Sequence, residues 1–358
     1  MTIVESLSKN SFSDLLHYLN STRMQYRKSL NLPSSITFGN EIEVNDIILD
    51  DAMEIVEDFN MRKKLWGRDH FIVHKDLTCD SEVVTPIMTD KPKYWSLLWD
   101  MYVCLDDHGA TYSDNTSSHI HMGTNLFNTP EKLSLLLKTL VVFEPIIFKF
   151  GYGRDEEPRE FITYRPNTSN YSMFMSPKRV RDFVSYLDSK KIGSMEELND
   201  KVNEFLNTDL RIRSSFNFRP FDFKKFIFPI LSNSENDHME FRNFNSADPI
   251  VVQNNIDLCG HLLLAVATGR IDKDYVLSEY EKYKKKRYNF DCFCATLDSR
   301  TTGPQYNRLL NGFNKVKMEK AIKLADMIFD DDLSKYHFLK QYLKLFSKDE
   351  EYVSSLCK

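Results

Sequence analysis

Two glutamates, Glu41 and Glu43, lie two residues apart in an expected strand at residues 36–44. Because side chains alternate between the two faces of a strand, these glutamates share one face about 7 Å apart, and the apolar Ile42 and Val44 share the other. Two like charges on one face repel each other unless a cation lies between them. The spacing therefore fits either a solvated strand face or a pair of carboxylates that hold a metal ion.

A second expected strand, residues 117–124, carries His119 and His121 at the same spacing of two. Neutral imidazole is a good metal ligand, and histidine can also contact a phosphate. An exposed strand with two histidines is the alternative.

A third expected strand, residues 238–244, places Glu240 and Arg242 on one face. A carboxylate beside a guanidinium can be a surface ion pair that contributes little stability. It is also the pair that phosphoryl transfer needs, since the carboxylate can hold a metal and the arginine can neutralise the transferring phosphate.

Four further charged residues are candidates. Asp76 lies at a turn before a strand that carries Glu82, and either can be a plain turn or edge residue. Arg165 lies in a polar loop at residues 151–180, and Arg213 lies in an expected strand at 211–218. Arginine binds phosphate or carboxylate through its bidentate fork, although surface solubility explains a single arginine equally well.

Strands and helices alternate early in the chain, and its end is helical. Helices are expected at residues 11–30, 50–66, 92–107, from 129 onward, and at 177–190, 249–269, 275–288 and 314–346; strands are expected at 36–44, 72–85 with a break at 76–78, 117–124, 211–218 and 238–244. This order predicts an α+β or α/β protein.

Composition limits the class of protein. The 358 residues are 42% hydrophobic, enough for a sizeable core, and the net charge of −5 gives no electrostatic reason to expect a nucleic-acid partner. Six cysteines in so long a chain do not form a disulfide framework, and the first 12 residues do not read as a signal peptide, so we expect a reducing cytoplasm. Residues 133–150 are apolar but include lysines, a glutamate and a proline, and predict a buried helix.

The order of these motifs resembles the amidoligase family over residues 36–268. The matching positions are Gly39, Glu41, Glu43, Asp76, Glu82, Thr85, Pro86, His119, His121, Glu144, Arg165, Asn217, Glu240 and Arg242. Two departures stand out: Asp76 is followed by Leu-Thr where the family often has Gly-Ser, and Ser117 and Ser118 replace a usual glycine or Cys-Gly.

The resemblance implies a fold and a reaction. The fold is α+β, with a curved antiparallel sheet similar to that of glutamine synthetase and glutamate–cysteine ligase, helices on its outer face and a helical C-terminal extension. It implies a catalytic domain at 1–270 and an extension at 271–358. The reaction is ATP-dependent ligation of a carboxylate to an amine through an acyl phosphate, which gives an amide or isopeptide bond.

Roles for individual residues also follow from the resemblance. It implies that Mg²⁺ or Mn²⁺ is held by Glu41, Glu43, Glu82 and Glu240, that the reaction uses Arg242, Glu240, His121 and Arg213, and that ATP contacts His119, Arg165, Asn217 and Asp76. The expected partners are small-molecule or peptide carboxylates and amines, with neither nucleic acid nor membrane, and the C-terminal helices can mediate oligomerisation. The alternative is an inactive binding or assembly protein with the same fold, which would not need the two paired charge motifs. A metallohydrolase is a weaker hypothesis, because the sequence lacks HExxH.

Overall fold

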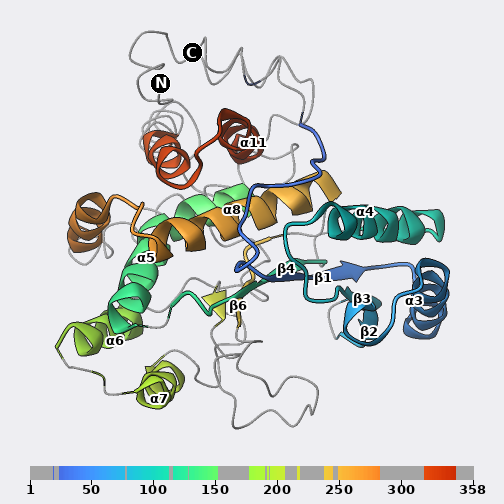
Figure 1. Cartoon of the computed structure of the whole chain (residues 1–358), viewed down its shortest axis with the longest axis horizontal. Coiled ribbons are helices and arrows are strands. Elements are labelled where there is room, and N and C mark those ends of the chain that lie inside the picture. The colour runs from blue at the N-terminus through green and yellow to red at the C-terminus, as the bar shows by residue number, and fades with distance from the viewer. Residues whose placement is uncertain are drawn as a thin grey trace, which may run out of the picture. The chain divides into compact units, whose positions relative to one another are not determined.

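An antiparallel sheet organises the part of the chain that carries the candidate residues (Figure 1). The computed structural model describes residues 19, 24–76, 79–112, 116–127, 129–151, 177–189, 192, 194–205, 216–217, 238–244, 249–282 and 318–343. Within these ranges the sheet has six strands: β1 (Phe38–Val44), β2 (Ile72–His74), β3 (Ser81–Val84), β4 (Ser118–Gly123), β5 (Phe216–Asn217) and β6 (His238–Phe241).

The strand order is β2-β3-β1-β4-β6-β5, and every pair is antiparallel. Since β2 and β5 are the edges, the sheet is not closed among the described strands. The prediction of an α+β chain with an antiparallel sheet is confirmed.

Helices make up most of the remaining described chain. They are α3 (Leu49–Lys63), α4 (Pro92–Asp107), α5 (Pro130–Gly151), α6 (Pro177–Ser189), α7 (Met195–Phe205), α8 (Pro249–Ala267), α11 (Asp332–Tyr342), the 3₁₀ helix η1 (Gly67–Asp69) and helical residues 273–282 and 318–328. The sequence analysis missed α7, which begins after Ser194, whose hydroxyl accepts the backbone N–H of Glu197 at 3.1 Å.

The chain divides into two compact units. The sheet unit comprises Gln25–Ser134 and Asn170–Leu264, and the helical unit comprises Met1–Met24, Leu135–Ser169 and Ala265–Lys358. All six strands lie in the sheet unit, and the boundaries fall within α5 and α8. The predicted domain boundary at residue 270 stays a prediction.

One face of the sheet is apolar and packs on helices. Phe38 and Ile42 of β1 and Ile120 of β4 are buried on this face, and Trp95 of α4 stacks on Phe38 with ring centroids 5.0 Å apart. In Figure 1, α8 lies on the same side of the sheet as α4. The alternate residues of the same strands therefore face the other way, and they include the candidate charged residues.

The expected helix at 11–30 is wrong at its C-terminal end, because residues 24–30 are not helical. The side-chain amide of Gln253 accepts the backbone N–H of Arg27 and donates to its carbonyl, both at 2.7 Å. The Asp90 carboxylate accepts the N–H groups of Leu30 and Leu32, each at 2.9 Å. These side chains come from distant parts of the sequence and hold the segment outside helical geometry.

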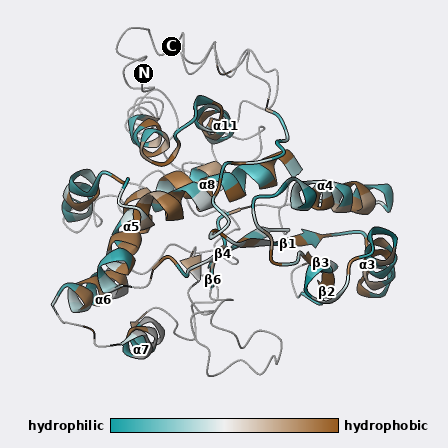
Figure 2. Ribbon diagram, in the orientation of Figure 1, coloured by the Kyte–Doolittle hydropathy of each residue, from teal (hydrophilic) through white to brown (hydrophobic). Residues whose placement is uncertain are grey.

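The helical unit has an aromatic core. Phe338 of α11 stacks on Phe150 of α5 with ring centroids 5.0 Å apart, and Figure 2 shows α5 as largely hydrophobic. The expected helix at 314–346 is two helices, separated at residues 329–331. Asp331 caps the second of them, because its carboxylate accepts the N–H of Ser334 at 2.8 Å.

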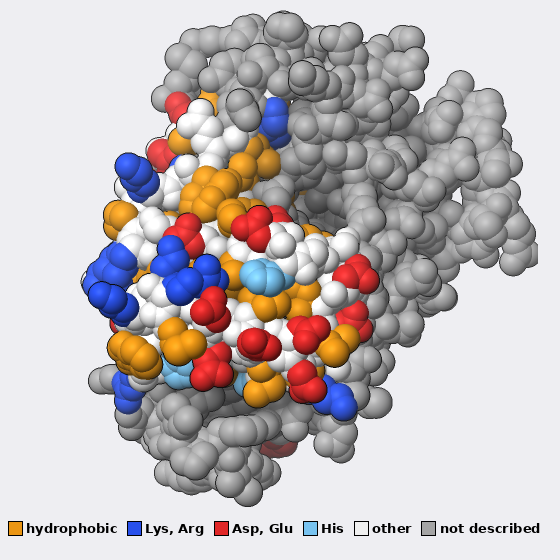
Figure 3. Space-filling view, turned by 90° about the vertical axis from the view of Figure 1, so that its right-hand side faces the viewer, with side chains coloured by type: hydrophobic (Ala, Val, Ile, Leu, Met, Phe, Trp, Pro, Cys, Tyr) orange, Lys and Arg blue, Asp and Glu red, His pale blue; other side chains and the backbone are white. Residues whose placement is uncertain are grey.

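Two surface features concern partners. Within the described residues, α8 alone is long and apolar enough to cross a membrane, and 78% of its most apolar 18-residue window is buried. Figure 3 shows Lys and Arg side chains gathered at one side of the described surface, with Asp and Glu over much of the rest and hydrophobic side chains between them. A surface of mixed charge with scattered apolar side chains is ordinary for a folded protein.

Candidate functional site

Strand register brings the candidate residues to one face of the sheet. Glu41 of β1 lies opposite His119 of β4, His121 lies opposite Glu240 of β6, and Glu43 lies opposite Glu82 of β3. Directly opposed residues of antiparallel strands share a face. We call this the carboxylate–histidine face; its members are Glu41, Glu43, Glu82, His119, His121 and Glu240.

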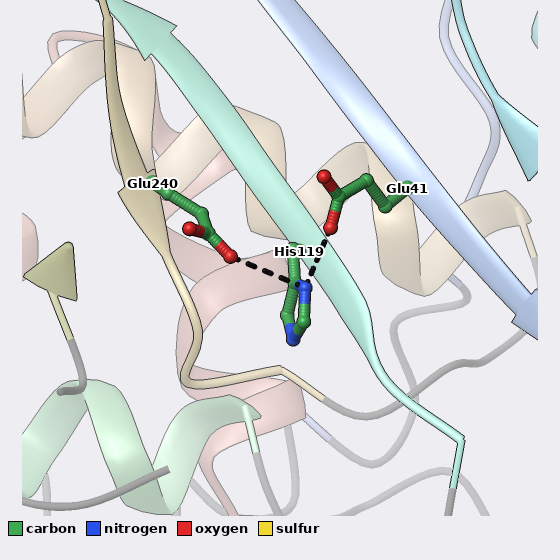
Figure 4. A group of neighbouring side chains, drawn as sticks. All are labelled: Glu41, His119 and Glu240. Carbon is green, nitrogen blue, oxygen red and sulfur yellow. Dashed lines mark hydrogen bonds and ion pairs between the residues drawn. The ribbon is translucent and has the colours of Figure 1, made fainter. Parts of the chain in front are cut away.

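Three of these side chains, from three strands, point toward one another (Figure 4). His119 Nδ1 lies 2.6 Å from Glu41 Oε2 and 3.2 Å from Glu240 Oε1. One ligand atom from each residue lies within 4.8 Å of the others. His119 and Glu240 are buried, and the Glu41 side chain is 19% exposed.

The donors of this triad fit a divalent cation. Carboxylate oxygens suit Mg²⁺ and Mn²⁺, and an imidazole nitrogen suits transition metals such as Zn²⁺ and Fe²⁺. Two carboxylates, one buried and one half-buried, that approach the same imidazole nitrogen also need a positive charge between them, because burial of unpaired charge is unfavourable. The structure thus brings together Glu41 and Glu240, which were both predicted to be metal ligands. It adds His119, which was predicted to contact ATP.

In the protein without metal, a proton on His119 can supply the positive charge between the two carboxylates. Burial and the Arg242 charge lower the pKa of His119, but its hydrogen bond to Glu41 and the charges of Glu240 and Glu41 outweigh them, so the pKa is raised. Burial also opposes the charge on Glu41, yet His121 and His119 hold the pKa of that carboxyl well below its usual range. A metal ion would thus compete with a proton on His119.

His121 supports Glu41 from the other side. Its Nε2 lies 2.8 Å from Glu41 Oε1, and its ring centroid is 4.8 Å from that of His238. Burial lowers the pKa of His121, but the charge and hydrogen bond of Glu41 raise it to about 9. The raised pKa favours the charged form of His121 beside Glu41 Oε1.

Arg242, directly after β6, forms an ion pair with Glu240 Oε1 through its NH1 group. Its side chain is 17% exposed. Burial lowers the pKa of Arg242, but the charges of Glu240 and Glu41 raise it above the ordinary value. A permanent positive charge therefore lies beside the triad, as the sequence predicted for this pair.

Glu43 and Glu82 occupy the side of the face toward β2. Both oxygens of Glu43 accept hydrogen bonds from Ser117, one from its backbone N–H at 2.7 Å and one from its hydroxyl. Glu82 lies 3.6 Å from Nδ1 of His74. Burial raises the pKa of both carboxyls, and the charge of Asp76 adds to the effect on Glu43.

The other predicted residues are distributed as follows. Asn217 lies in β5 directly opposite Glu240. Glu144 is buried in α5, in the helical unit. Arg165 and Arg213 lie outside the described residues.

The sequence analysis missed two histidines, His74 and His238, and the role of Ser117. Both histidines have a detectable signal. His238 precedes Glu240 by two residues, and His74 lies two residues before Asp76, so the same period of two would have included them. Ser117 was noted only as a departure from the family pattern, because its partner Glu43 is 74 residues away in the sequence.

No protein-family model matches the sequence, and no curated protein matches it. The function is therefore inferred from the site itself.

Proposed function

We propose that this chain is an ATP-dependent carboxylate–amine ligase that uses Mg²⁺ or Mn²⁺, with a catalytic sheet similar to that of glutamine synthetase and the amidoligases. The observation that carries the proposal is the convergence of Glu41, His119 and Glu240 from three strands. An antiparallel sheet with one apolar face on helices and one face of ionisable side chains supports the proposed fold class. The proposed substrates are small-molecule or peptide carboxylates and amines.

The proposed reaction has two steps. An oxygen of the substrate carboxylate attacks the γ-phosphorus of ATP; a new P–O bond forms, the bond from the γ-phosphorus to the bridging oxygen breaks, and ADP leaves. The amine nitrogen then attacks the acyl carbon, the C–O bond to phosphate breaks, and the amine loses a proton. The product is an amide, and inorganic phosphate is released.

The residues of the face have separate roles in this proposal. Glu41, His119 and Glu240 would hold the divalent ion, which when bound supplies positive charge against the phosphates. Arg242 adds a fixed positive charge beside Glu240 and suits the γ-phosphate, because a guanidinium binds phosphate oxygens through a planar fork. His121 holds Glu41 in place by its hydrogen bond to Oε1 of that carboxylate.

Thermal unfolding with and without nucleotide tests the proposal. We expect Mg²⁺ and ATP together to raise the Tm by about 2–5 °C, and by more than either alone, because a ligand at about 100 times its Kd stabilises by roughly 2.7 kcal/mol. Glu240→Gln should lose this shift, and its metal-free Tm should fall, because Arg242 and His119 lose a charged partner. Asp58→Asn is the matched control, since Asp58 forms only an exposed ion pair with Arg62 on α3.

The outcome separates the two classes of function. A shift with both components that exceeds the shift with either alone, lost in Glu240→Gln and kept in Asp58→Asn, supports the ligase and justifies screening carboxylates and amines for phosphate release. An unchanged Tm at millimolar Mg²⁺ and ATP contradicts it and favours the inactive binding or assembly protein.

A further inference from the structure

A buried serine connects two members of the carboxylate–histidine face. Ser117 directly precedes β4 and is 7% exposed, and it lies between Glu43 and His119, both at least as buried. Its hydroxyl contacts Glu43 Oε1 on one side and lies 2.7 Å from His119 Nε2 on the other. The far nitrogen of the same imidazole, Nδ1, belongs to the Glu41–Glu240 triad.

Hydrogen-bond polarity fixes which nitrogen of His119 carries a proton. The Ser117 hydroxyl donates its one hydrogen bond to Glu43 Oε1, while the other oxygen of that carboxyl accepts the Ser117 backbone N–H. The serine oxygen can then only accept from His119, which requires a proton on Nε2. A neutral imidazole with Nε2 protonated has its lone pair on Nδ1. This lone pair faces the Glu41 and Glu240 carboxylates and repels them, unless a cation lies between the three groups.

We propose that Ser117 is a positioning residue, and that the relay Glu43–Ser117–His119 keeps Nε2 protonated so that Nδ1 is the ligand atom for the divalent ion. The inference rests on the metal centre of the proposed function. In this arrangement Glu43 supports the centre from outside and does not bind the ion. This role differs from the metal ligand that the family resemblance implies for Glu43.

The surroundings of Glu43 support this role. Both carboxylate oxygens accept hydrogen bonds from Ser117, so the Glu43 side chain is turned toward the serine. The backbone N–H of Glu43 also donates to the Ser117 carbonyl at 3.3 Å, so both the main chains and the side chains of the two residues are hydrogen-bonded. Hydrogen-bond partners behind a metal-binding histidine fix its tautomer and ring orientation, and their removal typically weakens metal binding by roughly 10–100-fold.

The chain offers a matched control at the next residue. Ser118 is also a buried serine, but it points to the apolar face, where its oxygen accepts from the Asn40 side-chain amide at 2.7 Å. Ser118→Ala therefore removes a buried hydroxyl from the same strand without touching His119. Ser117→Thr keeps the hydroxyl at the relay position.

Mn²⁺ affinity of the full chain, measured by isothermal titration calorimetry, tests the relay. We expect Ser117→Ala to weaken binding by roughly 10–100-fold, and we expect Ser117→Thr and Ser118→Ala to stay within about threefold of the wild type. Thermal unfolding without metal verifies that each variant is folded. A Ser117→Ala affinity equal to that of Ser118→Ala overturns the inference.

A second readout follows His119 itself. In ¹⁵N-histidine spectra of the Zn²⁺-loaded wild type, we expect the metal on Nδ1 and the proton on Nε2 of the signal that disappears in His119→Gln. Coordination through Nε2 overturns the inference. If the wild type binds neither ion, the proposed metal centre fails, and the metal-free spectrum decides: an Nε2 proton that exchanges faster in Ser117→Ala supports the relay, and an unchanged rate overturns it.

Discussion

At the scale of single residues, the site is a set of opposite charges confined to one sheet face. Three glutamates of the face, Glu41, Glu43 and Glu240, are balanced by His119, His121 and Arg242. In the absence of a metal, these cations offset the charge of the carboxylates. It also means that each cation of the set has two roles, one in stability and one in the proposed chemistry.

Arg242 is the clearest test of this balance. We expect Arg242→Gln to lower the metal-free stability by about 2–3 kcal/mol, because it leaves Glu240 buried with one positive partner fewer. Saturating Mn²⁺ should recover most of the loss, since the ion supplies the missing charge. Urea unfolding with EDTA and with Mn²⁺ measures both values.

Arg62→Gln is the control for the Arg242 substitution. Arg62 forms an ion pair with Asp58 in which both side chains are more than half exposed, so its loss should change stability by less than about 0.5 kcal/mol. Equal destabilisation by the two substitutions would show that Glu240 does not depend on Arg242.

How much of the site could be predicted from the sequence depends on the distance between partners. The period of two correctly predicted that Glu41 shares a face with Glu43 and His119 with His121, and that Arg242 lies beside Glu240. It could not predict that Ser117 contacts Glu43, because that requires the β1–β4 register. Arg165 and Arg213 stay predictions, since they lie outside the described residues.

At the scale of elements, two glycines of the sheet face different surroundings. Gly39 of β1 and Gly123 of β4 lie on the carboxylate–histidine face. A Cβ on Gly39 would meet Thr85 Oγ1 at 3.7 Å and His121 Cβ at 3.8 Å, which are ordinary contacts. A Cβ on Gly123 would overlap the hydroxyl of Thr37.

We therefore expect Gly123→Ala to lower the free energy of unfolding by about 1–3 kcal/mol, because Thr37 must move. Gly39→Ala should be neutral or slightly stabilising, since glycine is unfavourable within a strand. Urea unfolding of the two variants gives the comparison. Equal stabilities would contradict the close approach of β4 to Thr37.

The helix α5 carries a buried lysine in the helical unit. Lys149 Nζ lies 4.5 Å from the centre of the Tyr342 ring, and burial lowers the pKa of Lys149 to about 8. The unfolded chain then binds more protons than the folded chain between about pH 8 and the ordinary lysine pKa of about 10.4. Stability should rise across this window by up to about 3 kcal/mol, as the unfavourable buried charge disappears.

Lys149→Met removes the titrating group and should flatten this rise. It should also stabilise the protein at pH 7, where the wild-type lysine is charged. Thermal unfolding of both proteins from pH 7 to pH 10 measures the difference. Parallel profiles for the two proteins would show that Lys149 does not titrate in this range.

The sequence predicted helices and strands well where local signals mark them. The prediction failed where side chains from distant parts of the sequence hold the backbone in another conformation. Proline at the start of α4 and α5 and the alternation in β1 and β4 gave elements close to the observed ones. Residues 24–30 had helical spacing, but Gln253 and Asp90 satisfy their backbone groups. Such partners are 60 to 226 residues away and leave no local trace.

At the scale of the whole molecule, the chain passes more than once between its two units. The helical unit takes residues 135–151 of α5 from the middle of the sequence and combines them with the C-terminal helices. There Phe150 stacks on Phe338, and Lys320 Nζ lies 5.9 Å from the centre of the Phe143 ring. The C-terminal helices therefore cover apolar side chains of a helix that an expected catalytic domain at 1–270 would retain.

This arrangement predicts the effect of truncation. A chain that ends at residue 270 should lose solubility or aggregate, because it exposes buried side chains of α5 that include Phe143 and Phe150. A chain that ends at residue 343 keeps every described helix and should stay soluble. Gel filtration and binding of a hydrophobic dye compare the two truncations with the full chain. A soluble, monomeric chain of 270 residues that keeps the Mg²⁺–ATP shift would show instead that the C-terminal helices are a separable extension, because the sheet and its metal centre would then fold without them.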